Sequence, residues 1–236
     1  MAFMSNRTAS DRIEKALRGR LERDGLTPTE DQQRALHRLG RYLSAETHRV
    51  VFVLRGSAGT GKTALLRALA QVSRSEKWTL RQMAPTGRAA KVLERRSRLM
   101  ASTIHRHIYT SNVDASGRVN FRLKENNDPP GSVYVVDEAS MIADQPGAGN
   151  HLLRDLVSYI FTESSLNKLL LVGDPAQLPP VGQDESPALN GQWLEERYAL
   201  RAAVTELREV QRQAAESGIL QWATALRDAL EDPSLP

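Results

Sequence analysis

The feature that most constrains this chain is a glycine-rich segment, residues 56–63, that directly follows an apolar run at residues 50–54. Its sequence, GSAGTGKT, has the GxxxxGKT spacing of a phosphate-binding loop between a strand and a helix. Glycines let successive backbone N–H groups turn toward one anion, at the positive end of the following helix. Lys62 supplies a charge for the β- and γ-phosphates, and Thr63 supplies a hydroxyl for Mg²⁺. The segment predicts a nucleoside triphosphate site, and the alternative is a glycine-rich turn without a ligand. The predicted ligands are Gly56, Ser57, Ala58, Gly59, Thr60, Gly61, Lys62 and Thr63.

Apolar, β-branched runs recur along the chain, and helix-like stretches lie between or beside them. This alternation indicates an α/β fold with a parallel sheet covered by helices on both faces. The expected strands are residues 50–54, 78–84, 133–136 and 169–172, and the expected helices are residues 11–23, 30–43, 62–73, 87–96 and 152–161. Residues 108–124 differ, because a DASG turn between mixed polar runs predicts a small β-hairpin excursion.

Composition excludes several classes of protein. The chain has no cysteine, which excludes a disulfide framework, a thiolate metal site and a cysteine nucleophile. Hydrophobic residues make up 40% of the 236 residues, enough for a core, so wholesale disorder is excluded. No apolar run approaches the ~20 residues of a membrane span. Arg7, Asp11 and Arg12 lie where a signal peptide would be apolar. We therefore expect a cytoplasmic protein.

Positive charge is concentrated in one segment. Residues 81–106 contain seven Lys and Arg against one acidic residue, Glu94, a local charge of +6 in a chain with a net charge of +4. Within it, Arg88, Lys91, Arg95 and Arg98 recur at three- and four-residue intervals, so we expect them on one helix face. The pattern favours sequence-independent binding of a phosphate backbone, and a solvated charged face is the alternative.

An acidic pair follows the third expected strand. Residues 133–136 lead directly into Asp137 and Glu138. Ligands of open α/β sheets bind at the carboxyl ends of the strands, so both side chains are candidates for the site. Asp137 is expected to hold Mg²⁺ through its waters, and Glu138 to orient and deprotonate the attacking water. The pair favours hydrolysis over transfer to another acceptor. Two solvated acids at a strand end are the alternative.

A rigid loop follows the fourth expected strand. Residues 173–182, GDPAQLPPVG, contain prolines, glycines and one amide, Gln177. The Gln177 amide can donate to a γ-phosphate oxygen and accept from a water or a neighbour. We therefore expect Gln177 to sense the γ-phosphate, with a proline-stiffened turn as the alternative.

Taken in order, these segments resemble the motifs of the superfamily 1 DNA helicases, and within them the RecD-like branch. The matching segments are GSAGTGKT (56–63), APTGRAAK (84–91), STIHR (102–106), VVDEAS (135–140) and GDPAQLPPVG (173–182). GDPAQLPPVG and VVDEAS together are highly specific for this family, whereas TIH and APTGRAAK indicate it only when the other motifs are also present. The resemblance covers about residues 26–230 and implies a RecA-like P-loop NTPase fold with ATP and Mg²⁺ as cofactors.

The resemblance also implies roles for single residues. Gln32, in TEDQQRA (29–35), is similar to the family glutamine that contacts adenine. ATP hydrolysis is assigned to Lys62, Thr63, Asp137 and Glu138, with Gln177 coupling the γ-phosphate to DNA and Arg212 acting as an arginine finger. Single-stranded DNA is the implied partner, with 5′→3′ travel. The expected DNA contacts are Pro85, Thr86, Gly87, Arg88, Lys91, Thr103 and His105. One interpretation of the hairpin is a strand-separating pin.

The expected domain organisation follows from the same motifs. Residues 1–25 form an N-terminal helical extension, and residues 26–204 form the RecA-like ATPase domain with the hairpin inserted at 108–124. Residues 205–236 resemble the start of a second RecA-like domain, which is incomplete here. An apolar stripe within residues 219–230 is expected to pack on the first domain or on a protein partner. We favour an N-terminal portion of a longer protein, and expect the isolated chain to bind ATP but hydrolyse it slowly.

Two other functions fit some of these features. A regulatory ATPase would use its nucleotide state to recruit a protein partner without unwinding DNA, with the apolar C-terminal stripe as the contact. A phosphoryl-transferring kinase would share the phosphate loop, but it lacks an evident acceptor site and has little use for Glu138. The leading function is an ATP-dependent single-stranded DNA translocase or helicase motor.

Overall fold

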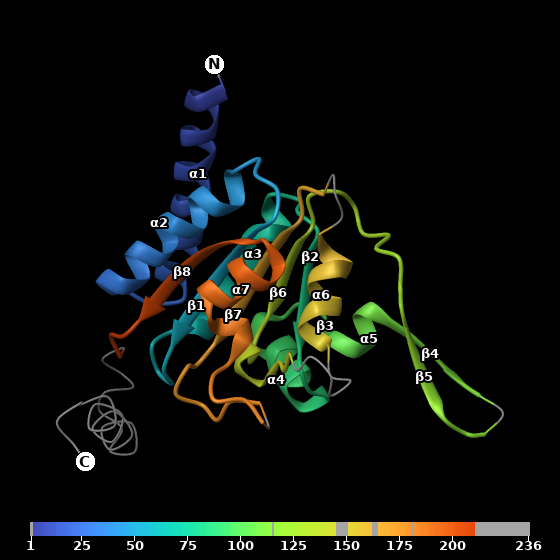
Figure 1. Ribbon diagram of the computed structural model, residues 1–236. Helices are drawn as coiled ribbons and strands as arrows, with labels where there is room; N and C mark the ends of the chain where they lie inside the picture. Colours follow the sequence, from blue (N-terminus) through green and yellow to red (C-terminus); the bar gives the residue numbers. More distant parts are fainter. Residues whose placement is uncertain (1, 115, 145–150, 162–164, 181, 211–236) are drawn as a thin grey trace, which may run out of the picture.

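A six-stranded parallel sheet in the order β3-β2-β6-β7-β1-β8 forms the centre of the molecule (Figure 1). The computed structural model describes residues 2–114, 116–144, 151–161, 165–180 and 182–210. The strands are β1 (Val50–Gly56), β2 (Leu80–Ala84), β3 (Ala101–Thr103), β6 (Val133–Val136), β7 (Lys168–Gly173) and β8 (Arg201–Leu207). The helices are α1 (Ala2–Arg23), α2 (Glu30–Ser44), α3 (Lys62–Ser75), α4 (Gly87–Ser97), α5 (Ile104–Ile108), α6 (Leu152–Ile160) and α7 (Gly191–Tyr198), with short 3₁₀ turns η1 (Ala139–Met141) and η2 (Pro187–Leu189).

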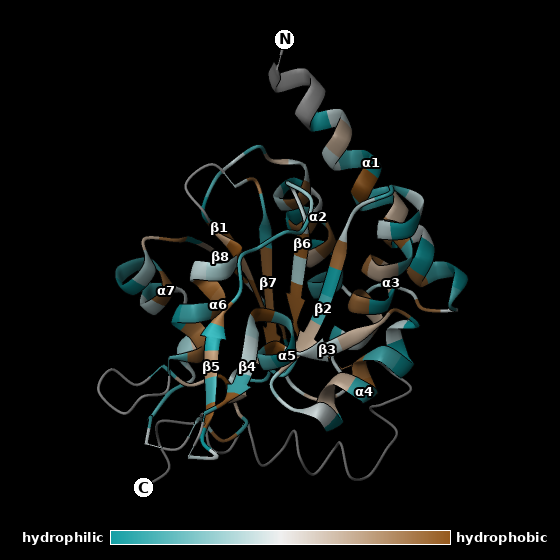
Figure 2. Ribbon diagram, turned by 90° about the vertical axis from the view of Figure 1, so that its right-hand side faces the viewer, coloured by the Kyte–Doolittle hydropathy of each residue, from teal (hydrophilic) through white to brown (hydrophobic). Residues whose placement is uncertain are grey.

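Helices cover both faces of this sheet because the central strands are apolar on both sides. In β1, Phe52 and Leu54 belong to one core cluster with residues of α1–α4, whereas Val51 and Val53 belong to a second cluster with residues of α5–α7. Figure 2 shows β7 coloured as hydrophobic between these layers. The expected α/β fold with helices on both faces is therefore confirmed.

The N-terminal helix α1 begins at Ala2, nine residues before the expected start, and packs against α2 and α3. Ile13, Leu17 and Leu21 lie at four-residue spacing and are at most 3% exposed, in the same core cluster as Phe52. These residues tie the expected extension, residues 1–25, to the core of the sheet domain.

We expect Leu17→Ala to lower the free energy of unfolding by about 2–5 kcal/mol, because it leaves a cavity in a packed core. Urea unfolding followed by circular dichroism measures the change, with the exposed Lys15→Ala on the same helix as the control. A loss for Leu17→Ala no larger than the loss for Lys15→Ala would show that α1 is not part of the core.

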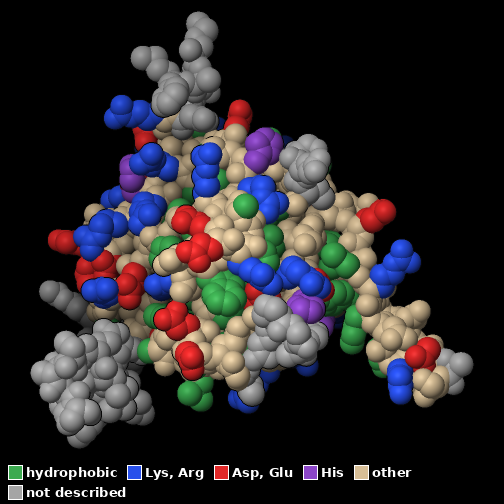
Figure 3. All heavy atoms as spheres, in the orientation of Figure 1, with side chains coloured by type: hydrophobic (Ala, Val, Ile, Leu, Met, Phe, Trp, Pro, Cys, Tyr) green, Lys and Arg blue, Asp and Glu red, His purple; other side chains and the backbone are tan. Residues whose placement is uncertain are grey.

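The expected hairpin is present as the antiparallel pair β4 (Tyr109–Val113) and β5 (Val119–Leu123). It projects from the body of the molecule, as Figures 1 and 3 show. Val113 pairs with Val119, and both side chains are more than half exposed, as is Phe121. The hairpin thus presents an unusually exposed apolar stripe to solvent.

Several elements lie beyond the sequence-based expectations. The short β3, α5 and α7 and the edge strand β8 were not predicted. Strand β8 pairs with β1 and continues to Leu207, so residues 205–207, expected to open the second domain, lie in the sheet of the first. In the part of the chain that the structure describes, no helix has the length and apolar character needed to cross a membrane.

Candidate nucleotide-binding site

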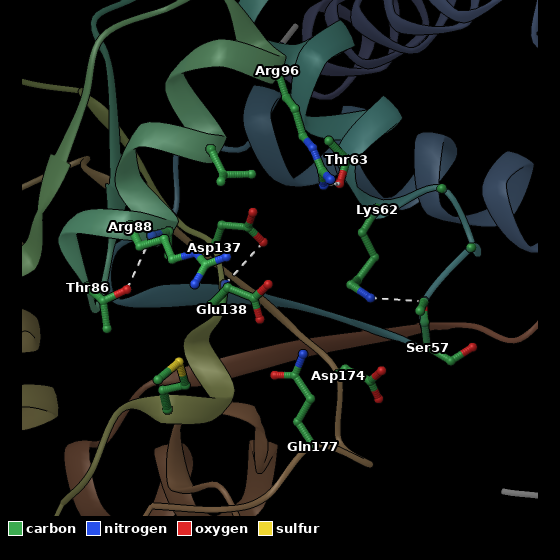
Figure 4. Close-up of a pocket in the computed structure, with 16 residues that line it drawn as sticks. Ser57, Lys62, Thr63, Thr86, Arg88, Arg96, Asp137, Glu138, Asp174 and Gln177 are labelled. Atoms are coloured by element: carbon green, nitrogen blue, oxygen red, sulfur yellow. Dashed lines mark hydrogen bonds between the residues drawn. The ribbon is translucent and has the colours of Figure 1, made fainter. Parts of the chain in front are cut away.

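Three loops meet at the carboxyl-end edge of the sheet and form a cavity of about 950 Å³ (Figure 4). The loops follow β1, β6 and β7, and β7 lies between the other two strands. This arrangement explains how motifs separated by more than a hundred residues in sequence come together. The cavity is lined by Ser57, Ala58, Gly59, Gly61, Lys62, Thr63, Thr86, Arg88, Ala89, Val92, Arg96, Asp137, Glu138, Met141, Asp174 and Gln177.

The phosphate loop, residues 56–63, ends at the N-terminus of α3, which is not capped by a side chain. The N-cap residue Gly61 has φ 91°, a left-handed conformation that favours glycine, and the first turn contains no acidic residue. By contrast, the Thr29 side chain caps α2 in a capping box. The uncapped N–H groups and the helix dipole leave the start of α3 suited to an anion.

Lys62 and Thr63 both line this cavity. The Lys62 ammonium donates hydrogen bonds to the loop carbonyls of Gly56 and, at 2.9 Å, of Ser57. A phosphate oxygen is a stronger, charged acceptor for the same ammonium. The Thr63 hydroxyl accepts a hydrogen bond of 3.4 Å from the Arg96 guanidinium.

Gln32 is buried behind the phosphate loop and does not line the cavity. Its Nε2 donates to the Thr60 carbonyl at 2.9 Å, and its Oε1 accepts from the Thr29 backbone N–H at 3.2 Å. Both ends of the amide thus bind the protein, and Gln32 braces the loop from α2. The adjacent Asp31 accepts from the backbone N–H groups of Arg208 and Glu209, so α2 also holds the end of β8.

The acidic pair lies at the end of β6 and points into the cavity (Figure 4). Burial first, and the Glu138 carboxylate second, raise the pKa of Asp137 to about 6, and the charges of Lys62 and Arg96 oppose the rise. Glu138 has φ 55°, which is uncommon for a residue with a side chain and costs of order 1–3 kcal/mol. Such strain is typical of functional sites.

Gln177 is held at the cavity by Ser140, a residue that the sequence did not single out. The Ser140 hydroxyl donates to Gln177 Oε1 at 2.7 Å, and Ser140 is fully buried. With its oxygen engaged, the amide presents its NH₂ group to the cavity (Figure 4). In the sequence, Ser140 could have been identified by its place in VVDEAS, three residues after Asp137. Asp174 also lines the cavity and was not predicted.

Helix α4 presents part of its positive charge to the nucleotide cavity, which the sequence did not predict. Arg88 and Arg96 line the nucleotide cavity, together with Val92 between them, whereas Lys91 and Arg95 are exposed elsewhere on the helix. Arg88, Lys91 and Arg95 are all exposed, and Arg88 in addition borders the nucleotide cavity, whereas Arg98 follows the helix as its C-cap residue. The spacing identified the neighbours on the helix correctly but not which side faces the phosphate loop.

The remaining expected DNA contacts lie around the starts of α4 and α5. Thr86 caps α4 by accepting from the Ala89 N–H, and Thr103 caps α5 by accepting from the Arg106 N–H. The His105 ring packs against the rings of Tyr109 and Phe121, tilted toward the first and edge-on to the second, at centroid distances of 5.5 and 6.0 Å. Pro85 and Gly87 flank Thr86 at the end of β2. Arg212 and the apolar stripe at 219–230 lie outside the described residues.

The family model of an AAA domain matches residues 28–232. The chain is 34% identical over 179 residues to the ATP-dependent RecD2 DNA helicase of Deinococcus radiodurans, covering 76% of this chain and 22% of that protein. It is 30% identical over 202 residues to the ATP-dependent DNA helicase dda of Enterobacteria phage T4, covering 85% of this chain and 42% of that protein. The chain thus spans less than half the length of each relative.

A solved structure supports the fold. The Pif1 helicase from Candida albicans superposes with a TM-score of 0.54 at 20% sequence identity, covering 89% of this chain and 45% of that chain. Together with the family match and the motifs gathered around the cavity, this likeness agrees with a RecA-like sheet. The chain belongs to the AAA domain family, as an N-terminal RecA-like domain of the RecD-like branch of the superfamily 1 helicases.

Proposed function

We propose that this chain is the ATP-hydrolysing core of a single-stranded DNA translocase or helicase. The observation that carries the proposal is the meeting of the phosphate loop, the acidic pair and Gln177 around one cavity beside α4. The cavity volume, about 950 Å³, lies within the range of ~300–1,000 Å³ that is usual for ligand sites.

The residues present fit Mg²⁺ bound with a nucleotide. Among the described residues, no group of three or more His, Asp or Glu could hold a metal by protein ligands alone. Mg²⁺ in nucleotide sites usually takes one or two protein oxygens and completes its shell with phosphates and waters. The Thr63 hydroxyl and the Asp137 carboxylate would hold it here. When bound, Mg²⁺ supplies charge neutralisation on the phosphates.

Each side chain has a distinct part in hydrolysis. Lys62 and the amides at the start of α3 bind the phosphates, and Glu138 orients a water and accepts its proton. Gln177, with its oxygen held by Ser140, donates its NH₂ toward the γ-phosphate. Gln32 supports adenine binding through the loop that it braces. Arg212 would stabilise the transferred phosphoryl group as an arginine finger.

DNA binding is proposed along the outer side of α4 and the start of α5. The surface consists of Pro85, Thr86, Gly87, Lys91, Thr103 and His105, next to the projecting hairpin. Thr86 lines the nucleotide cavity as well, so one residue borders both sites. The exposed Phe121 and valines of the hairpin suit contact with unstacked bases, as in a strand-separating pin. We extend the proposal to a 5′→3′ motor whose second RecA-like domain begins near the end of β8.

We expect Lys91→Ala to weaken binding of a single-stranded oligonucleotide and to reduce the slope of log affinity against log salt by about 1, because one phosphate contact is lost. Fluorescence anisotropy of a labelled oligonucleotide, titrated at several salt concentrations, measures both quantities. The exposed Arg38→Ala on α2 is the control and should change neither.

Two outcomes of this titration count against the proposal. If the unsubstituted chain binds no single-stranded DNA at low salt, the motor function is wrong, and a nucleotide switch that recruits a protein gains support. If Lys91→Ala and Arg38→Ala have the same affinity and salt slope, DNA does not bind along α4.

A further inference from the structure

Helix α4 divides its side chains among three sides. Ala90, Leu93 and Ser97 are buried. Arg88, Val92 and Arg96 follow one another at four-residue intervals and line the nucleotide cavity. Lys91 and Arg95 are exposed and do not line it. Two cations of the basic segment, both of them exposed, therefore border the nucleotide site.

Arg96 reaches the residue expected to ligate magnesium. Its guanidinium donates to Thr63 Oγ1 at 3.4 Å, and Arg96 lines the same cavity as Asp137. A guanidinium in contact with Thr63 lies beside the place where the terminal oxygens of a triphosphate would come, if Thr63 and Asp137 share one magnesium ion.

Arg88 lies at the N-terminal end of the row formed by Arg88, Val92 and Arg96, and it also lines the cavity. Figure 4 shows its side chain extending toward Asp137 and Glu138. Its guanidinium makes no hydrogen bond or ion pair with any side chain or backbone group among the described residues. Its five N–H donors thus remain available in a cavity that is lined by three carboxylates.

The charges that line the cavity support the same conclusion. Three cations, Lys62, Arg88 and Arg96, face three acids, Asp137, Glu138 and Asp174. Without the two arginines, one lysine and the backbone N–H groups at the start of α3 would face three carboxylates, and a γ-phosphate would lack two of its cationic partners. The α4 arginines therefore make this cavity electrostatically more suitable for a triphosphate.

We propose that Arg88 and Arg96 bind the terminal phosphate of a nucleoside triphosphate from the same domain as the phosphate loop. The inference rests on the proposed nucleotide site and adds two ligands to it. Guanidinium groups bind phosphate oxygens in a planar, bidentate manner, which suits them to the γ-phosphate. A diphosphate lacks that group, so the pair confers preference for ATP over ADP.

The test measures the affinities of the full chain for Mg·ATP and Mg·ADP by calorimetry in four variants. Arg88→Ala and Arg96→Ala are each expected to weaken ATP binding about tenfold or more, with ADP affinity changed less than about twofold. Arg96→Lys should bind ATP more tightly than Arg96→Ala but less tightly than the unsubstituted chain, because lysine keeps the positive charge but lacks the paired N–H donors of a guanidinium. Arg95→Ala removes the same charge from the same helix and should keep the original ATP:ADP ratio. Thermal melting shows that each variant is folded.

The outcomes separate this inference from the proposed function. An unchanged ATP:ADP ratio in both Arg88→Ala and Arg96→Ala, with nucleotide binding intact, would overturn the inference alone. An equal loss of ATP and ADP affinity would also overturn it, since the arginines would then act on the site as a whole. An unsubstituted, folded chain that binds neither nucleotide would contradict the proposed function, and the inference with it.

Discussion

Lys62→Ala is expected to weaken ATP binding about 100-fold, equivalent to about 2.7 kcal/mol. The ammonium lies over the carbonyls of Gly56 and Ser57 at the mouth of the phosphate loop, so its loss leaves the phosphates without their closest full charge. Arg88 and Arg96 remain on the other side of the cavity, and they cannot replace a lysine placed within the loop. Competition with a fluorescent nucleotide measures the change.

Lys15→Ala on α1 is the matched control, since it removes an exposed lysine far from the cavity. It should bind ATP as tightly as the unsubstituted chain. Equal ATP affinity in Lys62→Ala and Lys15→Ala would show that the loop does not bind phosphate.

Glu138→Gln is expected to keep ATP affinity within about threefold and to lower the rate of hydrolysis about 10²–10⁴-fold, the usual contribution of a general base. The amide is nearly isosteric with the carboxylate but cannot accept a proton from water. The substitution removes one negative charge beside Asp137. Magnesium binding should nevertheless be retained, because Asp137 keeps its place at the end of β6. Release of inorganic phosphate in single-turnover reactions measures the rate.

The control for this substitution is Glu125→Gln, an exposed glutamate between β5 and β6. It should hydrolyse ATP at the unsubstituted rate. A Glu138→Gln variant that loses ATP binding as severely as Lys62→Ala would refute the separate roles of binding and water activation.

The sequence was sufficient to predict the parts of the site whose chemistry is local. The phosphate loop, the acidic pair and Gln177 each follow an apolar run that becomes β1, β6 or β7. Parallel strands bring their carboxyl ends to one edge, so three separate motifs could be assigned to one place. The hairpin was predictable for a similar reason, because its turn lies between two short polar runs.

Contacts between helices and strands could not be predicted from the sequence. Helical spacing placed Arg88 beside Lys91 and Arg95, but only the packing of Ala90 and Leu93 decides which side of α4 faces the cavity. Ser140 was missed because its partner, Gln177, is 37 residues away along the chain. Strand β8 was missed because Arg201–Leu207 lies at the edge of the sheet and lacks a continuous apolar run.

Isothermal titration calorimetry of Mg·ATP into the purified chain tests the central claim most directly. The account predicts saturable binding at one site, with an affinity that drops when EDTA removes magnesium. Absence of binding heat, together with failure to displace a fluorescent nucleotide, in a chain that circular dichroism shows to be folded, would contradict it.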